Sequence, residues 1–415
     1  MLENNQKIPE GWSVKKLEDC FSFLKTPSYS RAETTDGGEV RYIHYGDIHT
    51  KYHLHVCPTD IDIFVSAEQA RKGDLLKTGD LILLDASEDY EGTTKCIELV
   101  DIKENDKVIS GLHTLALRDN TKNFANGFRA YITSIPFVKD LFWKQVSGFK
   151  VYGVSKDNLK KLKLIFPPLA EQEKIAEILG TWNEVIEKLS SLIEQKKLLK
   201  KGLMQKLLTG KVRLPGFTQP WKEVKLGEIT EFISGYSFDS SDFKENGVPL
   251  IRISNIKNDK ISLDNDSVFL DLSFLQKYTN YCIKYGDLLL AMSGATTGKM
   301  GVNKSNIPML LNQRVGIIRA KMSWQSFLNQ YLMRFNYKIL QMSYGGAQPN
   351  IGSNDIKRIK LYIPSDISEQ QAIADVLSTA DDEIDLLNKK LILFKEQKKG
   401  LMQQLLTGNI RVKVN

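Results

Sequence analysis

The sequence is organised around LAEQEKIAEILGTWNEVIEKLSSLIEQKKLLKKGLMQKLLTGKVR, residues 169–213, because most of this stretch occurs twice. When the sequence is shifted by 198 residues, the distance from Glu171 to Glu369, EQEKIAEIL aligns with EQQAIADVL and GLMQKLLTG with GLMQQLLTG, without a gap. The repeat therefore predicts one long helix that is written into the chain in two copies.

Both copies carry a narrow apolar seam. Its residues recur at spacings of three and four, and the first copy departs from this pattern where Lys196 and Lys200 stand at seam positions. The predicted seam consists of Ile175, Leu179, Trp182, Ile186, Leu189, Ile193, Leu203 and Leu207 in the first copy and Ile373, Leu377, Ala380, Ile384, Leu387, Leu391, Phe394, Leu401 and Leu405 in the second. A stripe of this kind requires a partner helix, and the other copy is the nearest candidate. Without the flanking segments, a dimerisation or scaffold rod remains an equally good interpretation.

The starts of both helices are marked in the sequence. Pro168 precedes the first helix and Pro364 the second, and Ser368 followed by Gln371 has the spacing of a capping box. Glu171 and Glu369 fall in the first turns, where the helix dipole favours acidic side chains.

Glycines mark the ends and one interior position of each helix. Gly210 and Gly408 follow identical Leu-Leu-Thr triplets and are expected to stop the helices. Gly202 and Gly400 stand inside the helices at matching positions. Because glycine costs a helix about 1 kcal/mol relative to alanine, they suggest close backbone approach or a local bend.

Composition sets broad limits. The chain has 415 residues, of which 42% are hydrophobic and 26% charged, so it has room for two or three domains of an ordinary globular protein. It has no run of 18 apolar residues, and its start is too polar for a signal peptide, which predicts a cytoplasmic protein without membrane contact. The four cysteines form no Cys-x-x-Cys pair, so we expect reduced thiols. The net charge of +7 favours a polyanionic partner.

The segments before each helix resemble each other faintly. The first contains WSVKKL, YIHYGDI (42–48) and KTGDLIL (77–83), and the second contains WKEVKL, LIRISNI (250–256) and KYGDLLL (284–290). We interpret 42–48 and 250–256 as strands, the Gly-Asp pairs as turns into further strands, and Phe137–Val146 and Trp324–Ser343 as helical. The prediction is a fold of the mixed α/β (α+β) class with an internal pseudo-two-fold repeat. Its parts are a first domain at 1–167, a long helix at 168–213, a second domain at 214–365 and a second long helix at 366–415.

The sequence predicts neither a catalytic site nor a metal site. SGATTGKM (293–300) is one residue short of a phosphate-binding P-loop and has Met300 where serine or threonine should bind magnesium, so it suits DNA phosphates better than a nucleotide.

All five histidines lie in the first domain, where a metal site on a strand with His53 and His55 is conceivable. Surface or core histidines are the better interpretation, because no metal-binding motif accompanies them. We interpret Asp80 and the acidic residues that follow it as solvated turns.

Polar and basic residues on loops remain as candidates for base and phosphate contacts. In the first domain they are Arg31, His44, Asp47, Thr93, Thr94, Lys95, His113 and Lys150. In the second domain they are Arg252, Asn255, Ser293, Thr296, Thr297, Lys299, Asn312, Gln313, Arg314, Gln348 and Asn350.

The whole chain resembles the specificity subunit of a type I restriction-modification system. The resemblance rests on KLKLIFPPLAEQEKIAEIL (161–179) and GLMQKLLTG (202–210), on their copies IKLYIPSDISEQQAIADVL (359–377) and GLMQQLLTG (400–408), and on the Gly-Asp-Leu turns at Gly79 and Gly286. It implies two target-recognition domains that each read one half of a bipartite DNA sequence, with the two helices paired between them as an antiparallel coiled coil.

The resemblance also implies partners for a non-catalytic chain. Two methyltransferase subunits would supply S-adenosylmethionine and adenine N6 methylation, and restriction and translocase subunits would supply ATP hydrolysis and cleavage with Mg²⁺. In one feature the chain departs from the family pattern: YGGAQPNIGSNDI (344–356) contains Gln-Pro, whereas SGFKVYGVSKDNL (147–159) does not, so Gln348 has no predicted equivalent in the first domain. The alternatives are a coiled-coil scaffold that joins two protein-binding modules and a metal-dependent nuclease that uses the first-domain histidines.

Overall fold

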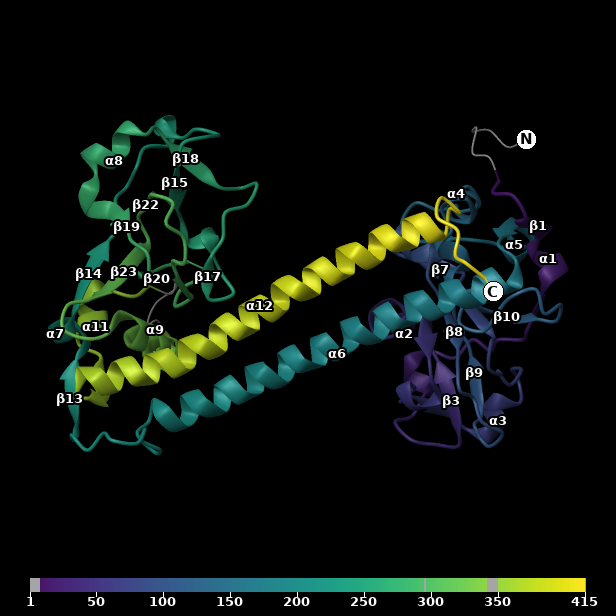
Figure 1. Cartoon of the computed structure of the whole chain (residues 1–415), viewed down its shortest axis with the longest axis horizontal. Coiled ribbons are helices and arrows are strands. Elements are labelled where there is room, and N and C mark those ends of the chain that lie inside the picture. Colours follow the sequence, from purple (N-terminus) through teal and green to yellow (C-terminus); the bar gives the residue numbers. More distant parts are fainter. Residues whose placement is uncertain (1–7, 295, 342–349, 415) are drawn as a thin grey trace. The chain divides into compact units, whose positions relative to one another are not determined.

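The computed structural model describes residues 8–294, 296–341 and 350–414. The chain packs as two compact units, and each unit draws on both long helices. The first unit comprises Met1–Ser190 together with Lys390–Asn415, and the second comprises Ser191–Lys389. The two units are described below one at a time, and Figure 1 labels their elements.

The two repeated stretches form helices of equal length. Helix α6 spans Leu169–Leu207 and helix α12 spans Ile367–Leu405, each with 39 residues, as the repeat predicts. The predicted stop signals are confirmed, since Gly210 and Gly408 adopt left-handed conformations with φ of 69° and 70°. The capping box at Ser368 is wrong. The helix begins at Ile367, so Ser368 lies in its first turn, and the Asp366 carboxylate accepts the Ser368 N–H at 2.8 Å.

The helices run antiparallel within each unit, as predicted. In the first unit, the rings of Trp182 and Phe394 meet edge to face with centroids 5.6 Å apart, and Lys398 donates to the Asn183 side chain. In the second unit, Lys196 pairs with Glu383 and Lys200 with Asp381, both at 2.6 Å. The two lysines that interrupt the apolar seam therefore have acidic partners on the other helix. Every predicted seam residue is buried or half-buried.

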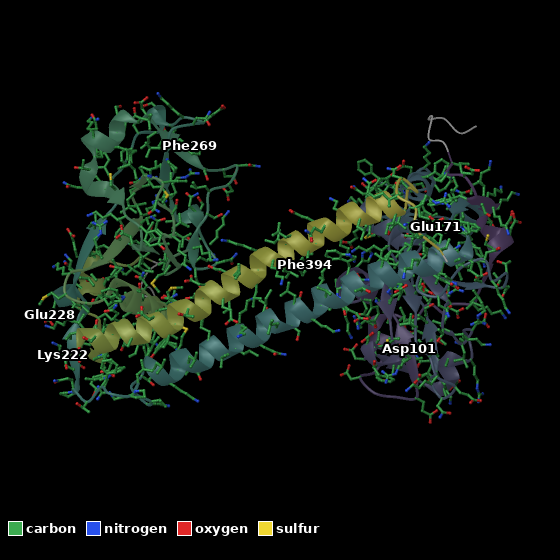
Figure 2. The ribbon with its side chains drawn as sticks, in the orientation of Figure 1. Asp101, Glu171, Lys222, Glu228, Phe269 and Phe394 are labelled. Atoms are coloured by element: carbon green, nitrogen blue, oxygen red, sulfur yellow. The ribbon has the colours of Figure 1, made fainter. Side chains whose placement is uncertain are left out.

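The Glu-Gln pair at the start of each helix has a defined role. Figure 2 shows Glu171 at the start of α6. The Arg411 guanidinium binds its carboxylate through two bonds of 2.7 Å, and Arg213 binds Glu369 in the same way at 2.9 and 2.6 Å. In each case the arginine that follows the end of one helix holds the first turn of the other. The sequence did not single out these arginines.

Short strands form the sheets of the first unit. They are β1 (Ser13–Lys16), β2 (Phe21–Phe23), β3 (Val40–Ile43), β4 (His55–Val56), β5 (Phe64–Val65), β6 (Leu81–Leu84), β7 (Ala86–Ser87), β8 (Cys96–Leu99), β9 (Val108–Ser110), β10 (Thr114–Asp119), β11 (Tyr152–Gly153) and β12 (Lys163–Phe166). The sheets have the orders β2-β10-β6-β8-β4 and β5-β3-β9, and β1 with β12 and β7 with β11 form separate pairs. Short helices complete the unit: α1 (Leu17–Cys20), α2 (Tyr45–Thr50), α3 (Ala67–Ala70), α4 (Pro136–Trp143) and α5 (Lys156–Lys160).

The second unit repeats this plan with larger sheets. Its strands are β13 (Trp221–Lys225), β14 (Thr230–Ser234), β15 (Val248–Ile251), β16 (Ile256–Lys257), β17 (Lys260–Ile261), β18 (Val268–Leu270), β19 (Cys282–Ile283), β20 (Leu288–Ala291), β21 (Met300–Val302), β22 (Met309–Leu311), β23 (Val315–Ala320) and β24 (Lys360–Pro364). They form sheets of order β14-β23-β20-β21-β17-β16 and β18-β15-β22-β19 and the pair β13 with β24. The helices are α7 (Leu226–Ile229), α8 (Ser273–Lys277), α9 (Gln325–Arg334), α10 (Asn336–Gln341) and α11 (Ser353–Lys357).

Two of the predicted strands are shorter than expected. The strand predicted at 42–48 ends at Ile43, because helix α2 begins at Tyr45, and the strand predicted at 250–256 ends at Ile251, where a 3₁₀ turn over Ile253–Asn255 follows. In both segments, the alternation of apolar residues continues beyond the end of the strand, although the backbone there forms a helical turn. The predicted helices near Phe137 and Trp324 are confirmed as α4 and as α9 with α10, although Ser343 lies outside the described residues.

The helix ends complete the cores of both units. In the first unit, Ile175, Leu179 and Leu405 pack with sheet residues such as Leu83 and Leu117. In the second unit, Leu207, Ile373 and Leu377 pack with Leu288 and Ile318. Each core thus combines residues from both helices, so the helices are integral to the units and do not merely link them.

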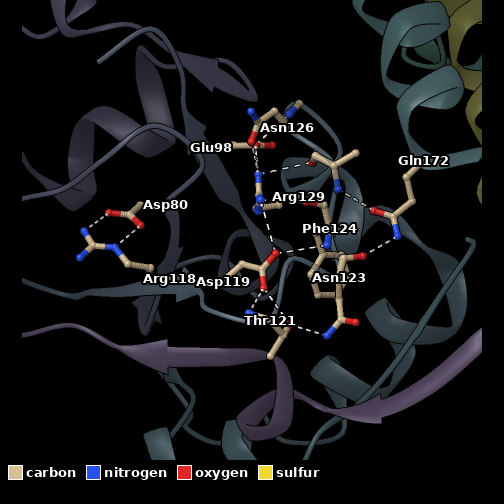
Figure 3. A network of polar contacts seen from close by, with 12 residues as sticks. Asp80, Glu98, Arg118, Asp119, Thr121, Asn123, Phe124, Asn126, Arg129 and Gln172 are labelled. Carbon is tan, nitrogen blue, oxygen red and sulfur yellow. Dashed lines mark hydrogen bonds and ion pairs between the residues drawn. The ribbon is translucent and has the colours of Figure 1, made fainter. Parts of the chain in front are cut away.

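A buried polar network anchors α6 to the first unit (Figure 3). Gln172, which is fully buried, accepts the Ala125 N–H at 3.0 Å and donates to the Asn123 and Pro167 carbonyls at 2.9 and 2.8 Å. Beside it, Arg129 pairs with buried Glu98 at 3.1 Å. Gln370 repeats the role of Gln172 in the second unit: it accepts from Trp324 N–H at 3.1 Å and donates to the Pro364 carbonyl at 2.9 Å.

The aspartate side chains of the two Gly-Asp turns are buried and not solvated. Asp80, only 2% exposed, receives two bonds from the Arg118 guanidinium at 2.9 and 2.6 Å, and Asp287 receives two from Arg319 at 2.8 and 2.6 Å. The interpretation of Asp80 as a solvated turn is therefore wrong, because a matching arginine four residues into strand β10 neutralises it. No helix in the described part of the chain is long and apolar enough to cross a membrane.

Candidate nucleic-acid interface

The two units share a backbone frame that places two loops side by side. The first loop follows β3 in the first unit and β15 in the second, and the second loop precedes β10 and β23. Gly111 N–H donates to the Ile43 carbonyl, and Asn312 N–H donates to the Ile251 carbonyl, both at 3.1 Å. These bonds fix the second loop against the end of the strand that leads into the first.

Further backbone bonds match residue by residue. The bond from Asp47 N–H to the His44 carbonyl corresponds to the bond from Asn255 N–H to the Arg252 carbonyl, and both are 3.0 Å long. The bond from Asp85 N–H to the His113 carbonyl, at 3.2 Å, corresponds to that from Met292 N–H to the Arg314 carbonyl, at 2.8 Å. His44 is therefore equivalent to Arg252, and His113 to Arg314.

The second unit gathers four of its candidate residues around one cavity. Arg252, Asn312, Gln313 and Arg314 line a hollow of about 330 Å³ together with Ile253 and Ser254. One guanidinium nitrogen of Arg252 donates to the Asp266 carbonyl at 2.8 Å, while its Nε is buried without a hydrogen-bond partner in the described residues. Gln313 and Arg314 are exposed. The hollow thus presents mainly hydrogen-bond donors, which suits the acceptors of base edges and phosphates.

The equivalent place in the first unit holds aromatic rings. Tyr45 lies 4.5 Å from the His44 ring and 5.3 Å from the His113 ring, between centroids. The His44 Nδ1 accepts the Gly46 N–H at 3.1 Å, and the His113 Nδ1 lies 3.3 Å from Asp85. Burial, and then the nearby Arg31, lower the pKa of His44, so this ring is neutral near pH 7 with its proton on Nε2.

Some candidates serve the fold and do not face a ligand. Asp47 is buried and pairs with Arg31 at 2.6 Å, so these two candidates neutralise each other. Asn255, 2% exposed, accepts the Arg252 N–H at 3.0 Å and donates to the Ser262 carbonyl. Thr93 is fully buried and donates to the Tyr90 carbonyl at 2.8 Å.

The remaining candidates lie on neighbouring loops. Ser293 forms a bridge with Asn350, and Gly294 approaches Ile253 at the rim of the 330 Å³ hollow. Thr296 and Thr297 are half-buried and Lys299 is exposed on the same loop, which brings the SGATTGKM motif to this site. Gln348 lies outside the described residues, as does the side chain of Thr94. In the first unit, Lys150 is exposed and Lys95 donates to the His49 carbonyl at 3.1 Å.

A larger groove in the first unit was not predicted. It has a volume of about 1,070 Å³ and is lined by residues of both long helices and of the first-unit loops, among them Lys95, Lys139, Lys395, Lys398 and Lys399. Burial lowers the pKa of Lys398, and Glu187 opposes this. The signal that could have revealed the groove is the run of lysines near the end of α12, which sequence reasoning treated only as part of a helix.

The histidines do not assemble a metal site within the described residues. His53 precedes β4 and is not on a strand, and His55 Nε2 contacts the Gly127 carbonyl at 2.8 Å. No group of three histidine, cysteine, aspartate or glutamate side chains in the described part of the chain could hold a metal ion.

Two related units, two long helices and equivalent polar loops define a tandem recognition protein. The family model described as type I restriction modification DNA specificity domain matches residues 9–196 and 218–394, so the chain belongs to this family of specificity subunits, which recognise DNA sequence.

Similar proteins cover the chain almost from end to end. The type I restriction enzyme MjaVIII specificity subunit of Methanocaldococcus jannaschii is 28% identical over 98% of this chain and 95% of its own length. Among solved structures, the S subunit of a type I restriction-modification system from M. genitalium superposes with a TM-score of 0.62 at 16% identity, covering 98% of this chain and 97% of its own. A structure from a study of complex assembly and conformational transition of the type I system gives a TM-score of 0.54 at 17% identity, with 96% and 97% covered. These likenesses confirm the predicted fold class.

Proposed function

We propose that this chain reads a bipartite DNA target, with one half-site for each unit. The observation that carries the proposal is the repeated backbone frame with different side chains at equivalent positions, His44 and His113 in one unit and Arg252 and Arg314 in the other. An identical frame suits the same duplex geometry, whereas different side chains suit different bases. The target would therefore be asymmetric.

The paired helices would set the distance between the half-sites. Each helix has 39 residues, which at about 1.5 Å per residue gives a length of about 60 Å. Two half-sites one or more turns of duplex apart are separated by multiples of roughly 34 Å. The helices are therefore long enough to serve as a ruler for an interrupted site.

The chemistry would belong to partner subunits. We assign to this chain the role of directing adenine N6 methylation by two methyltransferase subunits and cleavage by restriction and translocase subunits. S-adenosylmethionine, ATP and Mg²⁺ would bind to those partners. The name of the similar M. jannaschii protein, a specificity subunit of a restriction enzyme, supports this division of labour. Because the proposed target is cellular DNA, we place the protein in the cytoplasm.

Methylation mapping tests the proposal directly. Cells that carry this chain together with its modification partner should show N6-methyladenine in one interrupted, asymmetric motif. Cells that carry the modification partner alone are the control and should lack that motif. Methylation without a sequence motif, or in a continuous motif, would contradict the bipartite reading.

A coiled-coil scaffold that joins two protein-binding modules is the alternative. The release of counterions from DNA distinguishes the DNA-reading function from the scaffold. A protein that contacts several phosphates loses roughly 10³- to 10⁵-fold in its affinity for DNA between about 50 and 200 mM salt. The complex of this chain with its modification partner should show such a loss in fluorescence anisotropy with duplex DNA. Protein binding without any salt-dependent DNA affinity would favour the scaffold.

A further inference from the structure

One residue of each equivalent pair, 44 with 113 and 252 with 314, has an unusual backbone conformation. His113 and Arg314 both adopt left-handed conformations, with φ of 59° and 68°, at matching places before β10 and β23. A side chain other than glycine is uncommon in this region, and such strain accumulates at functional sites. The conformation is retained in both units although the residue type differs.

The partner position in each pair is held firmly. His44 and Arg252 directly follow the strands β3 and β15 and lie next to the left-handed residues. The Tyr45 ring lies between the two histidines, and the two arginines line one hollow. His44 is fixed through its Nδ1, and Arg252 through the Asp266 carbonyl. Each pair thus combines a fixed inner group with an exposed outer one.

The free hydrogen-bonding atoms differ between the pairs. The side chains of Arg252 and Arg314 offer donors only, and the Arg314 guanidinium is exposed without a hydrogen bond or ion pair to the described residues. In the first unit, His44 offers its Nε2–H as a donor. In the tautomer of His113 that donates its Nδ1–H to Asp85, the Nε2 is an acceptor.

These patterns match different base edges. In the major groove, guanine presents two acceptors, N7 and O6, whereas adenine presents the acceptor N7 beside the donor N6–H₂. We propose that the residue pairs 252 with 314 and 44 with 113 determine specificity, the two arginines reading guanine and the two histidines reading adenine. This inference rests on the proposed DNA-reading function and adds to it the base class and the residues.

Substitutions at Arg314 distinguish base reading from phosphate binding. The complex of the full chain with its modification partner is assayed for methylation of duplexes that carry each base pair in turn at every position of the wild-type motif. R314N keeps a residue that tolerates the left-handed backbone, and R314K keeps the charge but loses the planar fork. The measured quantity is the ratio of methylation of a target in which one guanine is replaced to methylation of the intact target. Both variants should raise this ratio by roughly 5- to 150-fold over the wild type, at one guanine of one half-site. R358A, at an exposed arginine of the same unit, should leave the motif unchanged.

A change of specificity tests the first unit. H113R gives the first unit an outer donor like that of the second, so the preference at one position of the other half-site should shift from adenine to guanine. The inference is overturned if R314K keeps the wild-type motif while R314N weakens all targets equally, or if H113R alters the half-site that the Arg314 variants relax. An unfolding midpoint equal to that of the wild type shows that the variants are folded. If the wild-type complex itself has no bipartite motif, the proposed function fails first.

Discussion

Gln172 and Gln370 show how single side chains fasten the long helices to the units. Gln172 satisfies one N–H group and two carbonyls that would otherwise be buried without partners. Q172L should therefore lower the free energy of unfolding by about 2 to 3 kcal/mol, because it leaves those groups unpaired. Urea denaturation of the full chain measures the effect. Q205L, at an exposed position of the same helix, is the control and should change stability by less than about 0.5 kcal/mol.

Lys398 makes stability depend on pH in a direction opposite to that of a salt-bridged lysine. Burial lowers its pKa below the ordinary value of 10.5, so between the folded pKa and 10.5 the unfolded chain binds more protons. The contribution of Lys398 to stability should therefore rise as the pH increases through this window. K398M should remove the rise. The difference in urea midpoint between wild type and variant should therefore not be the same at about pH 7 as at about pH 10. A constant difference would contradict the prediction.

Sequence reasoning at the residue level was limited by contacts between distant parts of the chain. The Glu-Gln pair was noticed as a repeat, but its partners were not: Arg411 lies 240 residues from Glu171, and no local pattern marks it. Asp80 was misinterpreted for the same reason, since its partner Arg118 comes from another strand. The candidates His44, His113, Arg252 and Arg314 were named as polar or basic residues on loops. The faint repeat aligns 42–48 with 250–256 and so His44 with Arg252, but only the fold pairs His113 with Arg314.

At the scale of elements, the long helices were predictable and the short strands less so. A 39-residue amphipathic repeat with glycine stops carries its own boundaries, and both helix ends follow the sequence. The strands that begin at Val40 and Val248 were predicted to extend too far, because the alternation of apolar residues continues into a helical turn. The capping residue of the second helix was misassigned, because Asp366 competes with Ser368 for this role.

The interior glycines of the helices were expected to mark close backbone approach or a local bend, and the structure contradicts the close approach. Apart from the adjacent residues and the nearby backbone of the same helix, no atom of the described residues lies within 4 Å of the position that a Cβ would take at Gly202 or Gly400. G202A and G400A should each stabilise the protein by about 1 kcal/mol, since alanine favours a helix more than glycine. The increase in the urea midpoint of unfolding measures this gain in stability. G408A is the contrasting variant: it should destabilise, because a left-handed residue gains a Cβ 2.5 Å from the Pro9 ring.

At the scale of the whole molecule, the proposed ruler makes a prediction about the target. Four residues inserted between Glu187 and Glu194 lengthen helix α6 by about 6 Å. If the helices set the spacing, the methylated motif should keep both half-sites and accept a spacer of different length. Methylation mapping in cells measures the change. The same insertion between Glu104 and Asn105, in an exposed turn of the first unit, should leave the spacer as it is. An unaltered spacer in the helix variant would refute the ruler.

The discontinuous make-up of the first unit has a consequence for how the protein matures. Residues Lys390–Asn415 belong to that unit, and Arg411 supplies the ion pair of Glu171. A ribosome adds these residues only after all of Ser191–Lys389, so the portion made earliest has to wait, with apolar side chains such as Leu179 uncovered, until translation has passed the other unit. The unit begun second is finished first. A nonsense codon near position 390 would thus damage the half of the protein that was synthesised long before it.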